Sequence, residues 1–546
     1  MAENVQTVPT QEEELVTNAY KLFEEFRAAY ESEWSRLEEN ERMYLGKHWE
    51  DMGGSTDIQP MTPVIQSTVE NLKADLMDNF PEAVIQPESP LDREVAEVIN
   101  ALVRQNHDAM GYRKEYRSLA HDLLVGGYCV QEVGYDPKAN RDLGGAFIRY
   151  VNSHNILIDP QVTDIQDGRA VFKIMPRTIA WLEQRYPEKQ GKFQQDGYAM
   201  KEDEKLKFDK TKSVLMLEYW WREYRDDRWQ VHMALLAGRQ LLEDSRTEKP
   251  DGYFSVGEYP FVVTTLYRRK NSALGYGVPD SFGRLQQYSD KLDQIALKNA
   301  AMSSHNKLLV TDASGFDAED LADWAREVHR GENLSGVTWF PTPPLPAYIV
   351  QAPSLLRQSV KEESGANDFS RGNTASGVTA ASAIAALQEM SSKRSRMIAQ
   401  QMQEAFKDAV RYEIEFEREF NVLPREVLLT VDGEQKTATF ESAMLSRRTA
   451  NGNDVPIEFF ISIKVQRENR WSVAAHNELI LQMTQLGVLQ PAQATELMVF
   501  EGKEELLGKT RQQQPDPMLE QAQAEQVALD EELANLPQPE QMNNQV

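Results

Sequence analysis

The chain has 546 residues, of which 41% are hydrophobic and 27% are charged, a composition typical of folded proteins and not of disordered ones. Its formal net charge is −27. Residues 1–60 hold fourteen acidic and five basic residues, and residues 511–546 hold seven and one. Because proteins that bind nucleic acid tightly cluster Lys and Arg, this balance argues against tight binding, although it does not exclude nucleic acid sliding past the surface.

The single cysteine, Cys129, excludes a disulfide within the chain and argues against a cysteine-based zinc site. We expect it to be a small core residue. The acidic start of the chain lacks the apolar segment of a signal peptide, and no stretch approaches 18 consecutive apolar residues. These features predict a soluble protein of a reducing cytoplasm.

The first half of the chain is predicted to begin with helices and continue as a mixed region. Apolar residues at three- and four-residue steps predict helices at residues 11–46, 64–80 and 92–125. Pro81 should end the second helix, and a short strand follows at residues 84–85. Strands are expected within residues 128–175, in a hairpin of residues 213–224 and 228–242, and at residues 261–267; a short helix at 178–186 and a polar loop at 187–212 lie between.

The middle of the chain is predicted to return to helix at residues 280–304 and then to hold a small mixed insert. In the insert we expect a strand at 307–311, a helix at 318–329, strands at 337–340 and 347–350, and an extended proline-rich run at 341–346 between them. Another helix is expected at residues 354–363.

Residues 364–381 stand out because fourteen of these 18 residues are Gly, Ser, Thr, Asn or Ala. Such a stretch has little apolar surface to fix it, which indicates a mobile loop. A helix of about 40 residues, roughly 60 Å long, is predicted after it at 378–420. Strands within 427–465, helices at 473–486 and 491–500, and a Gln- and Pro-rich acidic tail complete the chain.

Motifs for catalysis are not found. Gly508-Lys509-Thr510 resembles the end of a phosphate-binding loop, but the preceding glycine, Gly502, is one position too far away. The acids of residues 136–142 lack the glycine of a calcium loop, and the histidines lack zinc-hydrolase spacing. We therefore expect no enzyme activity, cofactor or metal. A metal-dependent hydrolase with an unrecognised acidic site stays open as an alternative.

Basic residues gather at two places, which are Arg268, Arg269 and Lys270, and Lys393 and Arg394. Each group can be a solvated face, a salt-bridge partner of another subunit, or a contact for phosphate. The sequence leaves these alternatives open.

The order of these elements resembles the portal proteins of tailed bacteriophages, in particular the large type of short-tailed phages. Four segments carry the resemblance: YLGKHW at 44–49, TPVIQSTVE at 62–70, YPF at 259–261 followed by GYGVP at 275–279, and GNTASG at 372–377 before a long helix. His48 stands where the family often has Gln. The resemblance covers roughly residues 10–500, and its strength lies in the order of the segments, since none is specific alone.

The resemblance implies an α+β, predominantly helical chain with the wing, stem, clip and crown of the portal fold, assembling into a ring around a central channel. The implied parts are a wing at 1–279, a stem helix at 280–304, a clip at 305–352, a second stem helix at 353–366, a channel loop at 367–379, a further wing part at 380–470, crown helices at 471–510 and a largely disordered tail at 511–546.

The resemblance also implies a function without catalysis. Portal proteins form rings, usually dodecamers, at one capsid vertex of the virion, where double-stranded DNA passes non-specifically during packaging and ejection. The implied partners are other copies of the chain, terminase, major capsid and scaffolding proteins, and a tail adaptor, with no membrane; assembly would occur in the host bacterial cytoplasm. A different acidic scaffold or adaptor ring remains the alternative.

Two groups of residues are candidates for contacts in such a ring. The clip residues Trp324, Arg326, Arg330 and Glu332 are candidates for docking terminase and the tail adaptor, although Trp324 can equally be a core residue. The loop residues Arg371, Gly372, Asn373, Thr374, Ser376 and Gly377 are candidates for lining the channel. Polar groups and one base per subunit would guide a duplex without trapping it, because each phosphate contact must be broken as DNA moves.

Overall fold

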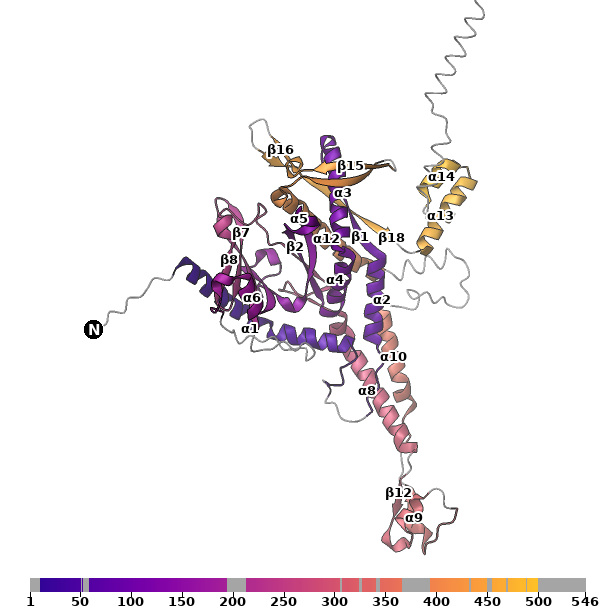
Figure 1. Ribbon diagram of the computed structural model, residues 1–546. Helices are drawn as coiled ribbons and strands as arrows, with labels where there is room; N and C mark the ends of the chain where they lie inside the picture. Colours follow the sequence, from indigo (N-terminus) through magenta and orange to yellow (C-terminus); the bar gives the residue numbers. More distant parts are fainter. Residues whose placement is uncertain are drawn as a thin grey trace, which may run out of the picture. The chain divides into compact units, whose positions relative to one another are not determined.

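The computed structural model describes residues 10–50, 52, 58–193, 213–304, 307–323, 327–339, 344–365, 393–431, 434–448, 454–467, 470–487 and 489–498. The chain divides into two compact units (Figure 1). The first comprises residues 1–427 and 439–466, and the second comprises residues 428–438 and 467–546. The mixture of helices and strands is compatible with the predicted α+β class.

Helix α1 (Gln11–Tyr44) confirms the first predicted helix. Its start is fixed by Thr10, whose hydroxyl accepts a hydrogen bond from the Glu13 amide while the Glu13 carboxylate accepts one from the Thr10 amide. Its apolar face packs on a sheet, where the rings of Phe23 and Phe26 each lie 5.6 Å from that of Phe172. These edge contacts attach α1 to the body of the first unit.

Three more helices and a strand follow: α2 (Val64–Asp78), β1 (Asn79–Pro87), α3 (Arg93–Met110) and α4 (Tyr112–Gly126). The break between α3 and α4 falls at Gly111, whose φ of 66° is readily adopted only by glycine. Helix α2 ends before Pro81, and this proline lies inside a strand that pairs with β18 (Phe459–Arg467).

A three-stranded sheet lies at the centre of the first unit, in the order β3 (Gly145–Val151), β2 (Tyr128–Asp136), β9 (Phe261–Thr265). Helix α12 (Lys393–Phe420) packs against it. The Cys129 sulfur lies 4.0 Å from the Met402 sulfur, and the rings of Tyr112 and Phe406 stack 5.1 Å apart. Cys129 is fully buried, which confirms its prediction as a core residue.

A five-stranded antiparallel sheet has the order β4 (Ile156–Ile158), β5 (Ala170–Thr178), β6 (Ser213–Arg225), β7 (Arg228–Ala237), β8 (Gln240–Asp244). The predicted hairpin is confirmed, but its second strand is not continuous to residue 242. The chain turns at Gly238 and Arg239, with φ of 54° and 62°, so that β8 pairs back onto β7. Short helix α6 (Ile179–Arg185) confirms another prediction.

The two sheets meet at a lysine held between two carboxylates. The Lys173 ammonium group lies 2.6 Å from Glu132 and 3.3 Å from Glu218. Burial raises the pKa of the Glu132 carboxyl, and the neighbouring Glu218 acts in the same direction. The ion pairs offset part of this cost, since an unpaired charge at this place would be strongly unfavourable.

Helix α12 also carries a buried polar network. Glu417 accepts hydrogen bonds from Asn106, from the Ala146 amide and from Arg425, with distances of 2.9, 2.9 and 3.2 Å. The network joins α3, β3 and the start of β14 (Arg425–Val431). The predicted helix at 378–420 is confirmed from Lys393 onward, and its first part lies outside the described residues.

Of the second unit, the structure describes parts of a strand pair and two helices. Strand β15 (Glu434–Phe440) pairs with β14, and helices α13 (Arg470–Gln485) and α14 (Pro491–Leu497) pack on each other. The sequence predicted both helices near these positions. Strands β16 (Ser446–Arg448) and β17 (Asp454–Pro456) form a separate pair in the first unit.

Candidate functional site

The feature with the clearest functional geometry is a helical hairpin. Helix α8 (Val278–Ser304) and helix α10 (Ala347–Ser364) run side by side in opposite directions, and the insert of residues 305–346 joins them (Figure 1). With 27 residues, α8 is about 40 Å long. The sequence predicted helices near both positions, at 280–304 and 354–363.

The start of α8 is clamped by one carboxylate. Asp280 accepts hydrogen bonds from the Gly277 amide at 2.7 Å and from Asn40 at 2.8 Å, and it pairs with Arg36. Asn40 and Arg36 also donate to the carbonyl oxygens of Val125 and Gly126, at 3.0 and 2.7 Å. The first turn of α8 is therefore bonded to α1, and the same α1 side chains are bonded to the end of α4. An acid in this turn also suits the positive end of the helix dipole.

Further along, α8 is attached to the segment before α2. The Gln286 side chain accepts a hydrogen bond from the Ile65 amide at 2.9 Å, and Gln294 donates to the Ile58 carbonyl at 2.8 Å. Between them, the buried carboxylate of Asp290 lies 3.1 Å from the His48 Nε2 atom. One side of α8 is thus covered by the segment that includes the YLGKHW motif.

Helix α10 is longer than predicted. The sequence predicted a strand at 347–350 and a helix only after Pro353, but one helix spans both. The predicted strand is wrong, because residues 347–350 form the first turn of a continuous helix that packs against α8. Pro353 is buried, and its carbonyl oxygen accepts a hydrogen bond from Ser289, which supports the helix at the place where proline removes a donor.

The hairpin exposes large apolar side chains on both of its helices. On α8 they are Tyr288, Ile295, Leu297 and Met302, and on α10 they are Tyr348, Val350 and Leu355. Tyr288 is 64% exposed, and Leu355 is 62% exposed. Single exposed apolar residues are ordinary, but several along one hairpin indicate a surface that another molecule covers.

The insert between the helices holds a two-stranded sheet, β12 (Leu308–Val310) and β13 (Val337–Trp339), and a short helix, α9 (Ala318–Ala322). The predicted helix at 318–329 was too long, since α9 ends at Ala322 and residues 327–330 are not helical. Arg330 and Glu332 are exposed, and neither lies on a helix. Trp324 and Arg326 fall outside the described residues.

The predicted channel loop also falls outside the described residues, so the positions of Arg371, Gly372, Asn373, Thr374, Ser376 and Gly377 stay predictions. The chain is described up to Gly365 and again from Lys393. Lys393 and Arg394 are exposed in the first turn of α12. Gly365, at the end of α10, lies next to Arg394, with a built Cβ only 3.3 Å from the Arg394 Cβ. The two flanks of the loop are therefore close together.

The other basic group does not act as a unit. Arg269 pairs with Glu33 of α1 at 2.7 Å and lies over the Tyr276 ring at 4.7 Å, so it takes part in the contacts beside the α8 clamp. Its salt bridge is within the chain, an arrangement that the sequence did not suggest. Arg268 and Lys270 are exposed. Arg268 lines an open cavity of about 640 Å³ beside β9 and α12.

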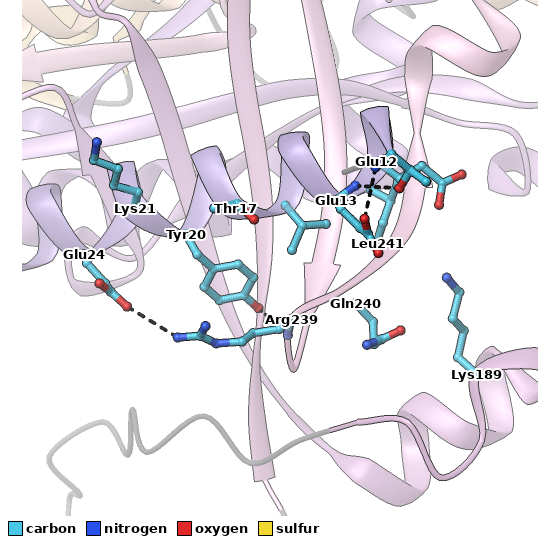
Figure 2. A pocket seen from close by; sticks show the side chains of 12 residues that line it. Glu12, Glu13, Thr17, Tyr20, Lys21, Glu24, Lys189, Arg239, Gln240 and Leu241 are labelled. Atoms are coloured by element: carbon cyan, nitrogen blue, oxygen red, sulfur yellow. Dashed lines mark hydrogen bonds and ion pairs between the residues drawn. The ribbon is translucent and has the colours of Figure 1, made fainter. Parts of the chain in front are cut away.

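A second open cavity, of about 610 Å³, lies at the start of α1 (Figure 2). Its charges are mixed and partly paired: Arg239 lies 3.8 Å from Glu24, while Glu13 is used in capping the helix. Neither this cavity nor the rest of the described chain brings together three His, Cys, Asp or Glu residues that could hold a metal ion. Among the described residues, no helix is long and apolar enough to cross a membrane.

The sequence did not indicate the residues that fix the start of α8. Arg36, Asn40 and Asp280 come from distant parts of the chain, and no local pattern marks them as partners. The available signal was weak: Asp280 follows Pro279 in the first turn of a predicted helix, which is a common place for an acid.

Comparison with known proteins agrees with this architecture. A search among curated proteins found no match. The family model described as Phage P22-like portal protein matches residues 20–546, which is nearly the whole chain. The chain therefore belongs to the family of P22-like phage portal proteins.

Proposed function

We propose that this chain forms a closed ring of twelve copies at one vertex of a phage capsid, and that the ring is the conduit for DNA packaging and ejection. Family membership carries this proposal, because portal proteins are structural components of virions and not enzymes. The ring would be assembled in the bacterial cytoplasm.

The helical hairpin supports a ring. Apolar side chains on the outside of α8 and α10 have no cover within the described chain, whereas neighbouring copies would cover them. The firm attachment of α8 to α1 and α4 would hold each hairpin at a fixed place in its subunit. A fixed hairpin is what a ring of defined number requires, since each subunit must present the same geometry.

The insert of residues 305–346 is proposed as the clip, the docking surface for terminase during packaging and for the tail adaptor afterwards. Exposed Arg330 and Glu332 support this use, and Trp324 and Arg326 are proposed to belong to the same surface. Reversing the charges of Arg326 and Arg330 should block both partners while leaving rings intact. Normal binding of both partners by such rings would contradict the assignment.

The residues of the loop at 367–379 are proposed to touch DNA in the channel. Arg371 is the only base among them, so a ring would carry one such group per subunit. Replacing Arg371 with Glu, or deleting residues 372–377, should leave assembly intact and impair packaging or retention of DNA. Packaging at the parental level would show that the loop is not the channel contact.

The test of the ring itself is native mass spectrometry of the purified chain, supported by electron micrographs. A portal should give a closed assembly of about a dozen subunits, in agreement with its family. A small oligomer would contradict the proposal and favour an ordinary enzyme or adaptor. Binding of duplex DNA to the purified ring should also be measured at several salt concentrations. We expect the binding to be weak and its affinity to depend little on salt.

A further inference from the structure

Six residues of α8 form an ordered stripe, and all of them except the half-buried Lys298 are exposed. Arg284, Lys291 and Lys298 are spaced seven residues apart, and so are Tyr288, Ile295 and Met302. The two rows are offset by four residues, so they lie together on one side of the helix. This side is opposite to Ser289 and Asp293, which contact α10. We call these six residues the α8 stripe.

Helix α10 carries a second stripe with the same spacing and different chemistry. Tyr348, Leu355 and Glu362 are seven residues apart, and Gln351 and Gln358 lie between them. All five are exposed. They lie opposite to Pro353 and Arg357, which contact α8. We call these five residues the α10 stripe. The hairpin thus has two different outer faces on opposite sides.

The charges of the two stripes are complementary. The α8 stripe contains three cations and no acid, whereas the α10 stripe contains Glu362 and no cation. Among the described residues, Arg284 has no ion-pair partner within its own chain. Two unlike and complementary faces on opposite sides of one unit suit head-to-tail contacts, which close into rings when the rotation is right.

The contacts inside the hairpin also fix the relative heights of the two stripes. Ser289 and Asp293 of α8 contact Pro353 and Arg357 of α10, so the midpoints of these contacts, Lys291 and Leu355, lie at one height. The two helices are antiparallel. The position seven residues before Lys291 on α8 therefore lies at the same height along the hairpin as the position seven residues after Leu355 on α10. These positions are Arg284 and Glu362, about 10 Å further along the hairpin.

We propose that the α8 stripe of one subunit packs against the α10 stripe of the next, with Arg284 paired to Glu362 across the interface. The occupant of each face is a second copy of this chain. In a ring whose axis runs along the hairpin, rotation preserves height, so the two groups meet. Tyr348 then lies near Lys298 and Ile295, and the apolar side chains of both stripes are covered. This inference rests on the proposed function, since it assumes a ring.

The experiment is a charge swap, read by native mass spectrometry and sedimentation at fixed protein concentration. Arg284→Glu alone and Glu362→Arg alone should each weaken association about ten-fold or more, because each places like charges opposite one another. The double variant R284E/E362R should recover assembly. Glu363→Arg is the matched control: this exposed acid lies next to Glu362 but about 100° around the helix, and its reversal should leave assembly near the parental level.

The outcomes separate the inference from the proposed function. If the parent chain forms no ring, the proposed function fails. If the parent forms rings and the single variants assemble equally well, or the double variant does not recover, the pairing of Arg284 with Glu362 is wrong while the ring stands. Far-ultraviolet circular dichroism spectra of all four variants should match the parental spectrum, because the substituted residues are exposed in the single chain.

Discussion

At the scale of single residues, the described chain places several charges in its interior, and each is bonded to partners from distant segments. Glu417 and Arg425 are the clearest pair, with side chains only 1% and 3% exposed. Arg425 also donates to the Asn106 side chain at 2.9 Å. Such a pair adds little net stability over an apolar pair of the same shape, but removing one partner leaves a buried charge.

Replacing Arg425 with Leu should therefore lower the free energy of unfolding by about 3–5 kcal/mol, because Glu417 would stay buried without its cation. Chemical denaturation of purified protein measures this change. The matched control is Arg104→Leu in α3, whose ion pair with Glu82 is exposed at the arginine and should cost less than about 1 kcal/mol. Equal losses in the two variants would contradict the role of burial.

A second residue predicts a dependence on pH. Burial raises the pKa of Asp75 to about 6, and the nearby Asp78 acts in the same direction, while a hydrogen bond from Ser395 opposes them. Asp75 lies in the last turn of α2, where the helix dipole also disfavours a negative charge. The folded chain thus holds a proton on Asp75 at pH values where the unfolded chain has released it.

Stability contributed by this proton falls as the pH rises from about 4 to about 6, since the folded state binds more protons in that window. We expect Asp75→Asn to be more stable than the parent at pH 7 by about 2–3 kcal/mol. The two proteins should converge at about pH 3, where the carboxyl is largely protonated in both states. Melting curves at pH values of about 3 and 7 test this; a gain that is the same at both pH values would contradict it.

At the scale of elements, the junction between α4, β2 and α8 depends on close backbone packing. Gly127 has a φ of 89°, and a Cβ built on it would lie 2.3 Å from the Tyr276 carbonyl carbon. No side chain fits there without moving the segment that leads into α8. The junction and the Asp280 clamp together fix where α8 begins.

Gly127→Ala should consequently lower the free energy of unfolding by about 3 kcal/mol or more, through both backbone strain and the clash. It should also increase hydrogen exchange in the first turns of α8. Gly191→Ala is the matched control, because Gly191 has a similar φ of 74° but nothing within 4 Å of the built Cβ. Its cost should be about 1 kcal/mol. If Gly191→Ala lowered the free energy of unfolding as much as Gly127→Ala, backbone strain alone, and not the clash, would account for the loss.

Prediction from sequence worked best where one element carries its own signal. The periodic apolar residues of α1 and α8 predicted these helices to within two residues at each end. Prediction failed where tertiary contacts decide. The segment Tyr348–Val350 has strand-forming residues after a proline-rich run, yet it forms the first turn of α10, a longer helix that packs against α8. Likewise, β8 separates from β7 at a two-residue turn that the apolar pattern does not mark.

The candidate site was predictable in outline only. The sequence indicated two stem helices and an insert, and helices and strands are found there. It could not indicate that Arg269 pairs with Glu33, because the partners are 236 residues apart and each residue type is common on surfaces. The bonds of Asp280 to Arg36 and Asn40 could not be predicted either, because these residues are similarly far apart in the sequence. Such pairs become visible only when the fold brings the segments together.

At the scale of the whole molecule, the excess negative charge and the Gln-rich composition of residues 511–546 predict a segment with little apolar area to bury. Deleting these residues should therefore leave soluble protein that assembles as the parent does, measured by native mass spectrometry. A shorter deletion of residues 531–546 serves as the comparison. Loss of assembly in the longer deletion alone would show that residues 511–530 contribute a packed element.

The burial of Cys129 has a practical consequence. The whole chain has one thiol, it is inaccessible, and burial raises its pKa, so little thiolate is available to react. The parent protein should stay unmodified by maleimides while folded. A cysteine introduced at any exposed position would then be the sole reactive group per copy, which allows fluorophores, spin labels or cross-linkers to be attached to one chosen place on every subunit without first removing a native thiol.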